Sequence, residues 1–184
     1  MVSYMSGSPD LRDKVIESRG FLKKLQLSIP GLREYRTLED IRAADELLRK
    51  QVFDKLDGAK DRLEATRKAM ADKGDFSNLT QMGSTISLLQ QIAGEVFHAQ
   101  QGSAGISPNI RIDEGTLNKL YEYDYNFVNS AEQVFSAANS SLAEYTSGTA
   151  TSQAITAKID QMLEDFKHAW QTRLESVEDI LITK

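Results

Sequence analysis

The chain has 184 residues, of which 40% are hydrophobic, 27% charged and 8% aromatic, and it contains no cysteine. The lack of cysteine excludes disulfides, thiolate metal sites and cysteine nucleophiles. A chain of this length forms one domain with a sizeable core, and no apolar run reaches the roughly 20 residues that a membrane span requires. We therefore expect a cytoplasmic, single-domain protein.

The formal net charge of -5 is unevenly spread. Residues 1–36 carry 7 Lys or Arg against 4 Asp or Glu, whereas residues 76–184 carry 6 against 13. Nucleic-acid affinity depends largely on clustered Lys and Arg, so the acidic body argues against a nucleic-acid partner. The basic head favours an acidic protein or an anionic lipid surface.

The first predicted element is an amphipathic helix over residues 9–29. Ser8-Pro9-Asp10 is typical of a helix start, and Ile29-Pro30-Gly31 ends the pattern. Its apolar face comprises Leu11, Val15, Leu22, Leu25 and Ile29. We expect this helix, within a head segment of residues 1–36, to pack on the rest of the chain. The alternative is peripheral contact with a membrane through residues 9–29.

Four further helices are predicted in residues 37–184. Their expected boundaries are Thr37 to Lys73-Gly74, Ser77 to about residue 99, Asp113 to about Tyr145, and about Ser152 to the C-terminal region. Each carries one apolar stripe with spacings of three and four. The stripe of the third comprises Leu117, Leu120, Val128, Ala131, Phe135, Ala138 and Leu142. These features predict an all-α fold, an elongated antiparallel four-helix bundle or coiled coil with the additional N-terminal helix.

Both histidines complete an acidic-x-x-His pattern, Glu95 with His98 and Asp165 with His168. This is the layout of a carboxylate-bridged di-iron bundle, in which the ligands project into the core. At 100° per residue, however, all four side chains lie well away from the apolar stripes of their helices. We therefore expect exposed polar positions and no metal or other cofactor. A metal site formed by these four residues is the alternative.

Three charged residues lie inside apolar stripes: Asp45, Asp124 and Arg173. In an antiparallel up-down-up-down arrangement, which makes the first and third helices parallel, the helical rise places them at similar heights. Because an unpaired buried charge costs several kcal/mol, we expect the three to meet in a buried polar layer, with Tyr121 close enough to donate to a carboxylate. The layer is interpreted as a control of helix register. Two alternatives remain open: the three residues form a ligand or proton site, or they lie at stripe edges that are in contact with water.

Residues 120–127 are rich in aromatic side chains. Tyr123 and Tyr125 lie roughly 90 to 110° from the stripe centre, on opposite flanks of the predicted helix. With Tyr121 they form either helix-seam packing or an interaction patch, and the sequence leaves both open. No serine occurs in a nucleophile-elbow context, so no catalytic residue is assigned.

Two blocks resemble an uncharacterised prokaryotic family of long-helix proteins. The first contains Ile29, Pro30, Gly31, Tyr35, Arg42, Ala44, Asp45, Leu48 and Arg49, and the second is LNKLYEYD at 117–124. The resemblance covers about residues 29–145. It implies no enzymatic activity and an association with stomatin-like or stress-response membrane assemblies.

From these observations we expect a non-enzymatic helical scaffold or adaptor that binds protein partners and self-associates. A metal- or ligand-binding bundle with a redox or sensor function is one alternative. A peripheral lipid-binding protein that uses the N-terminal helix is another.

Overall fold

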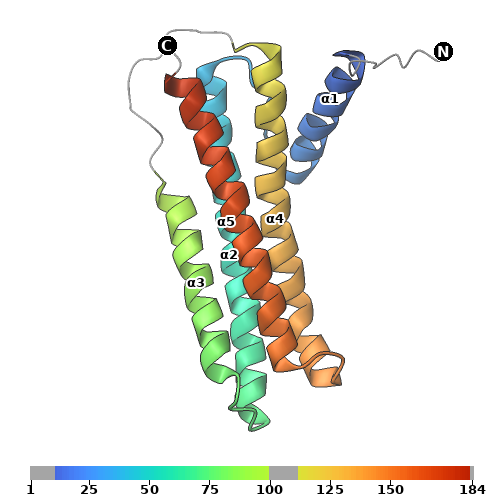
Figure 1. The fold of residues 1–184 in the computed structure, drawn as a ribbon, viewed down its shortest axis with the longest axis vertical. Coiled ribbons are helices and arrows are strands. Elements are labelled where there is room, and N and C mark those ends of the chain that lie inside the picture. The colour runs from blue at the N-terminus through green and yellow to red at the C-terminus, as the bar shows by residue number, and fades with distance from the viewer. Residues whose placement is uncertain (1–10, 100–111, 183–184) are drawn as a thin grey trace, which may run out of the picture.

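A computed structural model describes residues 11–99 and 112–182, and within these ranges every regular element is an α-helix (Figure 1). The helices are α1 (Leu11–Ser28), α2 (Leu38–Asp72), α3 (Leu79–His98), α4 (Glu114–Ser147) and α5 (Ser152–Ile182). The predicted all-α class is confirmed. The predicted start at Ser8-Pro9-Asp10 and the side chains of Leu11 and Val15 lie outside the described residues.

None of the helices in the described ranges combines the length and the apolar character needed to cross a membrane. Several helix boundaries follow the predicted local chemistry. Thr37 and Asp40 form a capping box at the start of α2, and Asp113 caps α4 by accepting from the backbone N–H of Thr116 at 2.9 Å. Gly74 follows α2 at a φ of +74°, a conformation that glycine adopts without strain.

The predicted N-cap of the second long helix is wrong by one residue. Helix α3 begins at Leu79 after Asn78, and Ser77 makes no capping bond. Instead, the Ser77 hydroxyl donates to Asp75 Oδ1 at 2.9 Å. Ser77 therefore belongs to the turn before α3, one residue ahead of the N-cap position that Asn78 occupies.

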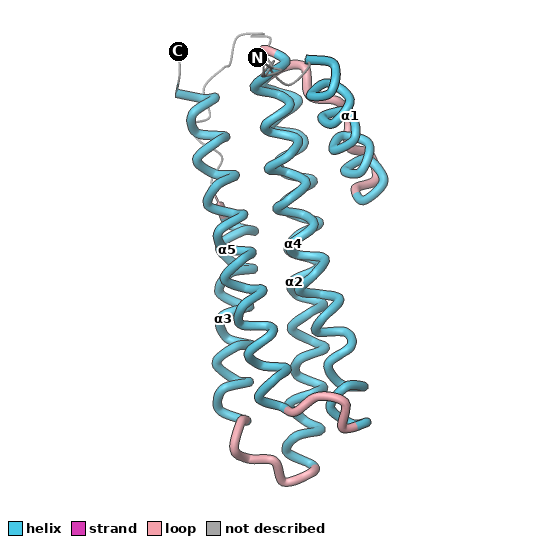
Figure 2. Tube along the Cα trace, turned by 45° about the vertical axis from the view of Figure 1, so that its right-hand side comes forward, coloured by secondary structure: helices cyan, strands magenta, loops and turns pink. Residues whose placement is uncertain are grey.

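The four long helices lie side by side along the long axis of the molecule (Figure 1, Figure 2). Consecutive helices form two antiparallel hairpins, α2 with α3 and α4 with α5, and α2 packs extensively against α4. Helices α2 and α4 run in the same direction. Their contacts pair residues at similar distances from the two helix starts: Lys55 Nζ lies 2.7 Å from Glu132 Oε2, and the hydroxyls of Thr66 and Ser141 are 2.7 Å apart.

An up-down-up-down order of helices places α2 and α4 in the same direction, but it does not specify that these two helices are direct neighbours. An apolar stripe determines which face of a helix is buried, but it does not determine the order of helices around the core. Helix α1 packs against α4 on the outside of this group. Leu25 of α1 and Ile29, which directly follows the helix, are 0% and 2% exposed, as expected for a packed head helix.

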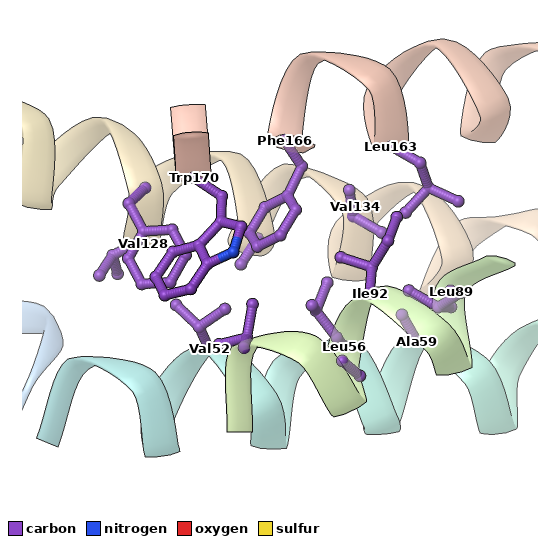
Figure 3. Close-up of a cluster of buried hydrophobic side chains, with 14 of the residues drawn as sticks. Val52, Leu56, Ala59, Leu89, Ile92, Val128, Val134, Leu163, Phe166 and Trp170 are labelled. Atoms are coloured by element: carbon purple, nitrogen blue, oxygen red, sulfur yellow. The ribbon is translucent and has the colours of Figure 1, made fainter. Parts of the chain in front are cut away.

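The core lies between the facing stripes of α2, α3, α4 and α5 (Figure 3). The Phe127 ring of α4 stacks on Trp170 of α5 with centroids 4.8 Å apart. One predicted core position is wrong, because Leu142 is 38% exposed while the adjacent Ser141 is fully buried. The Thr66 hydroxyl supplies a partner for Ser141 across the α2–α4 contact, so the polar residue is accommodated inside.

Candidate functional site

Arg173 of α5 is the centre of a buried charge cluster. Its side chain is 1% exposed, and it donates to two carboxylates, Asp45 of α2 and Asp124 of α4. Nη1 lies 2.6 Å from Asp45 Oδ1, and Nε lies 2.6 Å from Asp124 Oδ1. The guanidinium also lies over the Phe127 ring, 5.2 Å from its centroid. One side chain thus joins three helices, and the three residues expected to meet do so.

Asp45 extends the cluster to the end of α3. Its Oδ2 accepts from Arg49 Nε at 2.8 Å. Arg49 Nη1 in turn donates to the backbone carbonyls of Phe97 at 3.2 Å and Ala99 at 2.9 Å. The Phe97 carbonyl belongs to the last turn of α3 and Ala99 is the C-cap, so both lie where intrahelical donors are missing. The cluster therefore holds the C-terminal end of α3 against α2.

Asp124 has a second donor in the segment that connects α1 to α2. The Tyr35 hydroxyl donates to Asp124 Oδ2 at 2.8 Å. The backbone N–H of Tyr35 donates to the Tyr121 hydroxyl at 3.0 Å, and the two rings lie 4.8 Å apart. Both oxygens of this buried carboxylate are therefore occupied, and the connecting segment is tied to α4.

The cluster contains two carboxylates and two guanidinium groups, so its formal charges balance. Burial alone raises the pKa of Asp45, but Arg173 and Arg49 more than compensate and hold that pKa below its ordinary value. For Asp124, burial raises the pKa above its ordinary value although Arg173 and the Tyr35 hydroxyl oppose the shift. The carboxylates of Asp45 and Asp124 pull the pKa of Arg173 above its ordinary value despite burial, so Arg173 stays charged.

The two tyrosines of the cluster act as neutral hydrogen-bonding groups. Burial raises the pKa of Tyr35 well above its ordinary value, and the neighbouring Asp124 raises it further. Burial raises the pKa of Tyr121 to about 12. Both phenols therefore keep their protons at neutral pH, which suits them to positioning rather than to proton transfer.

The buried polar groups are fully used by the protein itself. In residues 11–99 and 112–182, no buried side-chain nitrogen or oxygen lacks a hydrogen-bond partner. A ligand that bound at Arg173 would have to displace an existing ion pair, which is costly in a buried site. The geometry is therefore that of a closed structural cluster.

The four residues of the alternative metal site are all exposed. Glu95 accepts from Gln91 at 2.8 Å, and Asp165 accepts from Gln161 at 3.0 Å, both within their own helices. No group of three or more metal-ligating side chains in a suitable arrangement occurs in the described part of the chain. The structure does not bring Glu95, His98, Asp165 and His168 together as a ligand set.

The three tyrosines of residues 120–127 have different environments. Tyr121 is only 5% exposed, so its assignment to a surface patch is wrong. Asp124 follows Tyr121 by three residues, so both side chains lie on the same face of α4. Tyr125 is half-buried beneath α1, with its ring 5.4 Å from that of Phe21, and therefore belongs to a helix seam. Tyr123 is half-buried.

Two cluster residues, Tyr35 and Arg49, were not expected at the site. The spacing of Arg49, four residues after Asp45, is the usual signal for an ion pair on one helix face. Tyr35 had no such signal, since it lies 89 residues before Asp124 in the sequence. The sequence indicated Tyr121 as the phenol near Asp124, but in the structure Tyr35 is the donor and Tyr121 accepts from the Tyr35 backbone.

A second polar group joins the turns at the opposite end of the long helices. Asp75, between α2 and α3, accepts from Ser152 at 2.7 Å and from Tyr145 at 3.2 Å. Hydrogen bonds from Ser152 and Ser77 lower the pKa of Asp75. This group is peripheral, and its contacts connect the two hairpins.

Comparison of the chain with protein-family models, curated proteins and solved structures gave no match. The resemblance of residues 29–145 to a long-helix family stays a prediction.

Proposed function

We propose that the chain is a non-enzymatic helical scaffold or adaptor, an elongated four-helix bundle with α1 on its side that acts by binding other proteins. The closed charge cluster supports this role. Asp45, Asp124 and Arg173 are buried and paired with one another. A catalytic or ligand site needs polar groups that converge on an accessible pocket, whereas these groups converge on each other.

Apolar side chains on the outside of the molecule give further support. Leu27 is 79% exposed, Phe76 69% and Phe97 48%. They lie on α1, on the turn between α2 and α3, and on α3. A helical framework locked by internal ion pairs holds such side chains in defined positions, which favours recognition by proteins at little entropic cost.

Site-specific photo-crosslinking in cells tests this proposal. A photoreactive phenylalanine analogue replaces Phe76 or Phe97 in the full chain, and the same analogue at exposed Gln153 or Gln171 is the control. We expect discrete protein adducts at the aromatic positions. Sedimentation velocity of the purified protein establishes whether one adduct is a second copy. Absence of adducts at Phe76 and Phe97 would contradict a scaffold role.

Metal analysis separates the scaffold from a metal-binding sensor. The full chain, purified without a histidine tag, is expected to contain no stoichiometric iron, manganese or zinc. Stoichiometric metal that disappears in His98→Ala or His168→Ala would overturn the proposal. Both substitutions replace exposed side chains, so the fold is expected to survive them.

A further inference from the structure

One side of the α2–α4 pair is only partly covered. Val128, Phe135 and Leu142 follow at seven-residue intervals on α4 and therefore share a face. Val128 is 9% exposed, Phe135 is half-buried and Leu142 is 38% exposed. Helix α1 lies beside the upper part of α4, and below its end no described element covers this side (Figure 1, Figure 2). The apolar stripe thus becomes more exposed beyond α1.

A hollow lies at the upper end of this side, and the strip that runs from it past Phe135 to Leu142 is here called the α2–α4 groove. A Cβ atom at Gly58 of α2 would lie 3.0 Å from the Phe135 ring, so the aromatic side chain packs directly against the backbone of α2. The hollow at its upper end, next to the last turn of α1, has a volume of about 470 Å³. The exposed Leu27 lines this end together with Val128.

The groove is bordered mainly by cations. Lys24 lies over the Tyr125 ring, 5.1 Å from its centroid, and Lys55 pairs with Glu132 at 2.7 Å. Arg62 is exposed and follows Lys55 by seven residues, which places it on the same face of α2. Within the described part, neither Lys24 nor Arg62 has a carboxylate at ion-pair distance. Three cations and one carboxylate give this groove a positive charge in a chain whose net charge is -5.

We propose that the α2–α4 groove binds an acidic amphipathic helix of a partner protein. The apolar face of that helix covers Leu27, Phe135 and Leu142, and its carboxylates face Lys24 and Arg62. This inference rests on the proposed scaffold function and specifies its partner. An open, elongated groove encloses too little of a small molecule, but it suits a helix laid along two others, as α1 is laid on α4.

Binding of a synthetic peptide to the full chain tests the proposal. The probe is a fluorescein-labelled helical peptide with leucines on one face and glutamates on the other, and its counterpart has lysines in place of the glutamates. Fluorescence anisotropy is expected to show saturable binding of the acidic peptide only. Lys24→Glu and Arg62→Glu are each expected to weaken binding about tenfold, because each replaces an attraction by a repulsion.

Matched variants outside the groove make the result specific. Lys158→Glu reverses an exposed charge on α5 and is expected to leave binding unchanged. Leu142→Ser is expected to weaken binding, whereas Phe97→Ser on α3 is not, although Phe97 is the more exposed of the two at 48%. Circular dichroism verifies that each variant is folded. No saturable binding, equal binding of both peptides, or equal affinity of Arg62→Glu and the wild type would overturn the proposal.

Two other occupants of the groove, a lipid surface and a second copy of the chain, would give different experimental results. A lipid surface would be identified if the chain binds no peptide but sediments with anionic phospholipid vesicles, and if this co-sedimentation is lost in Lys24→Glu. A dimer that dissociates in Leu142→Ser would identify a second copy. Either result overturns the partner-helix proposal. The scaffold function is tested separately, because Phe76 and Phe97 lie outside the groove and adducts there persist if only the groove proposal fails.

Discussion

Arg173 and Asp124 form an ion pair at 2.6 Å in which both side chains are only 1% exposed. Asp45 lies on the other branch of the same guanidinium, at 2.6 Å from Nη1. Breaking such a pair from one side leaves a charge in the interior without compensation, whereas an exposed pair loses little. The energetic role of the cluster is therefore open to direct measurement.

Replacing Arg173 by Met is expected to lower the free energy of unfolding by about 3 to 5 kcal/mol, because Asp45 and Asp124 lose their shared partner inside the protein. Urea unfolding followed by circular dichroism measures the change. Lys158→Met, at an exposed position of the same helix, is the control and is expected to change the free energy by less than about 0.5 kcal/mol. Equal unfolding midpoints for the two variants would refute the structural role of Arg173.

Removing the whole set of buried charges is expected to restore stability. A variant that combines Asp45→Leu, Asp124→Leu, Arg173→Met and Tyr35→Phe removes the three most buried charges together, while Arg49 loses Asp45 but keeps its hydrogen bonds to the carbonyls of Phe97 and Ala99. Its stability is expected within about 1 to 2 kcal/mol of the wild type. If the cluster controls helix register, amide resonances of this variant broaden or double. Sharp single resonances would argue against that interpretation.

The Tyr35 hydroxyl is expected to contribute about 1 to 3 kcal/mol, because Tyr35→Phe leaves one oxygen of buried Asp124 without its donor. Tyr123→Phe is a suitable control, since the Tyr123 hydroxyl has no hydrogen bond to the described residues. Thermal and urea unfolding of both variants provide the comparison. A larger effect at Tyr123 would contradict the assigned contact.

The parallel packing of α2 against α4 is testable by a disulfide, because the chain has no cysteine of its own. The hydroxyls of Thr66 and Ser141 are 2.7 Å apart, so the two side chains are in direct contact, which a disulfide between these positions requires. Thr66→Cys with Ser141→Cys is expected to oxidise within one chain, as shown by gel mobility and thiol titration. Thr66→Cys with exposed Ser136→Cys is the control, and cross-linking there at an equal rate would contradict the register.

Stability is expected to fall at acidic pH. Hydrogen bonds from Ser152 and Ser77 lower the pKa of Asp75, and Arg173 and Arg49 outweigh burial to lower that of Asp45. Groups with a lowered pKa in the folded state stabilise it above their unfolded pKa and lose this contribution as the pH falls through the folded value. Asp124, whose pKa is raised, acts in the opposite sense.

We therefore expect the urea midpoint to decline below about pH 4. The decline should be shallower in Asp75→Asn, which has no carboxylate to protonate at that position. Measurements of the midpoint between neutral and acidic pH provide the test. A decline of unchanged steepness in Asp75→Asn would exclude that residue as a contributor.

The sequence by itself determined the helices and the content of the cluster. Caps such as Thr37 and Asp113 and stripes with three- and four-residue spacing act within one helix, so they are visible without tertiary structure. The same periodicity identified Asp45, Asp124 and Arg173 as charges on apolar faces. Because buried charges must be compensated, their mutual contact followed.

Only the tertiary structure decided how the helices are ordered around the core and which further groups complete the cluster. An apolar stripe does not specify which neighbouring helix covers it, so neither the direct contact between α2 and α4 nor the exposure of Leu142 below the end of α1 was predictable. The Tyr35 hydroxyl donates to Asp124, which lies 89 residues later in the sequence. Arg49 of α2 donates to a carbonyl at the C-terminal end of α3, which the sequence of α2 alone does not indicate. These contacts depend on packing between segments, whereas local periodicity reports only on each segment alone.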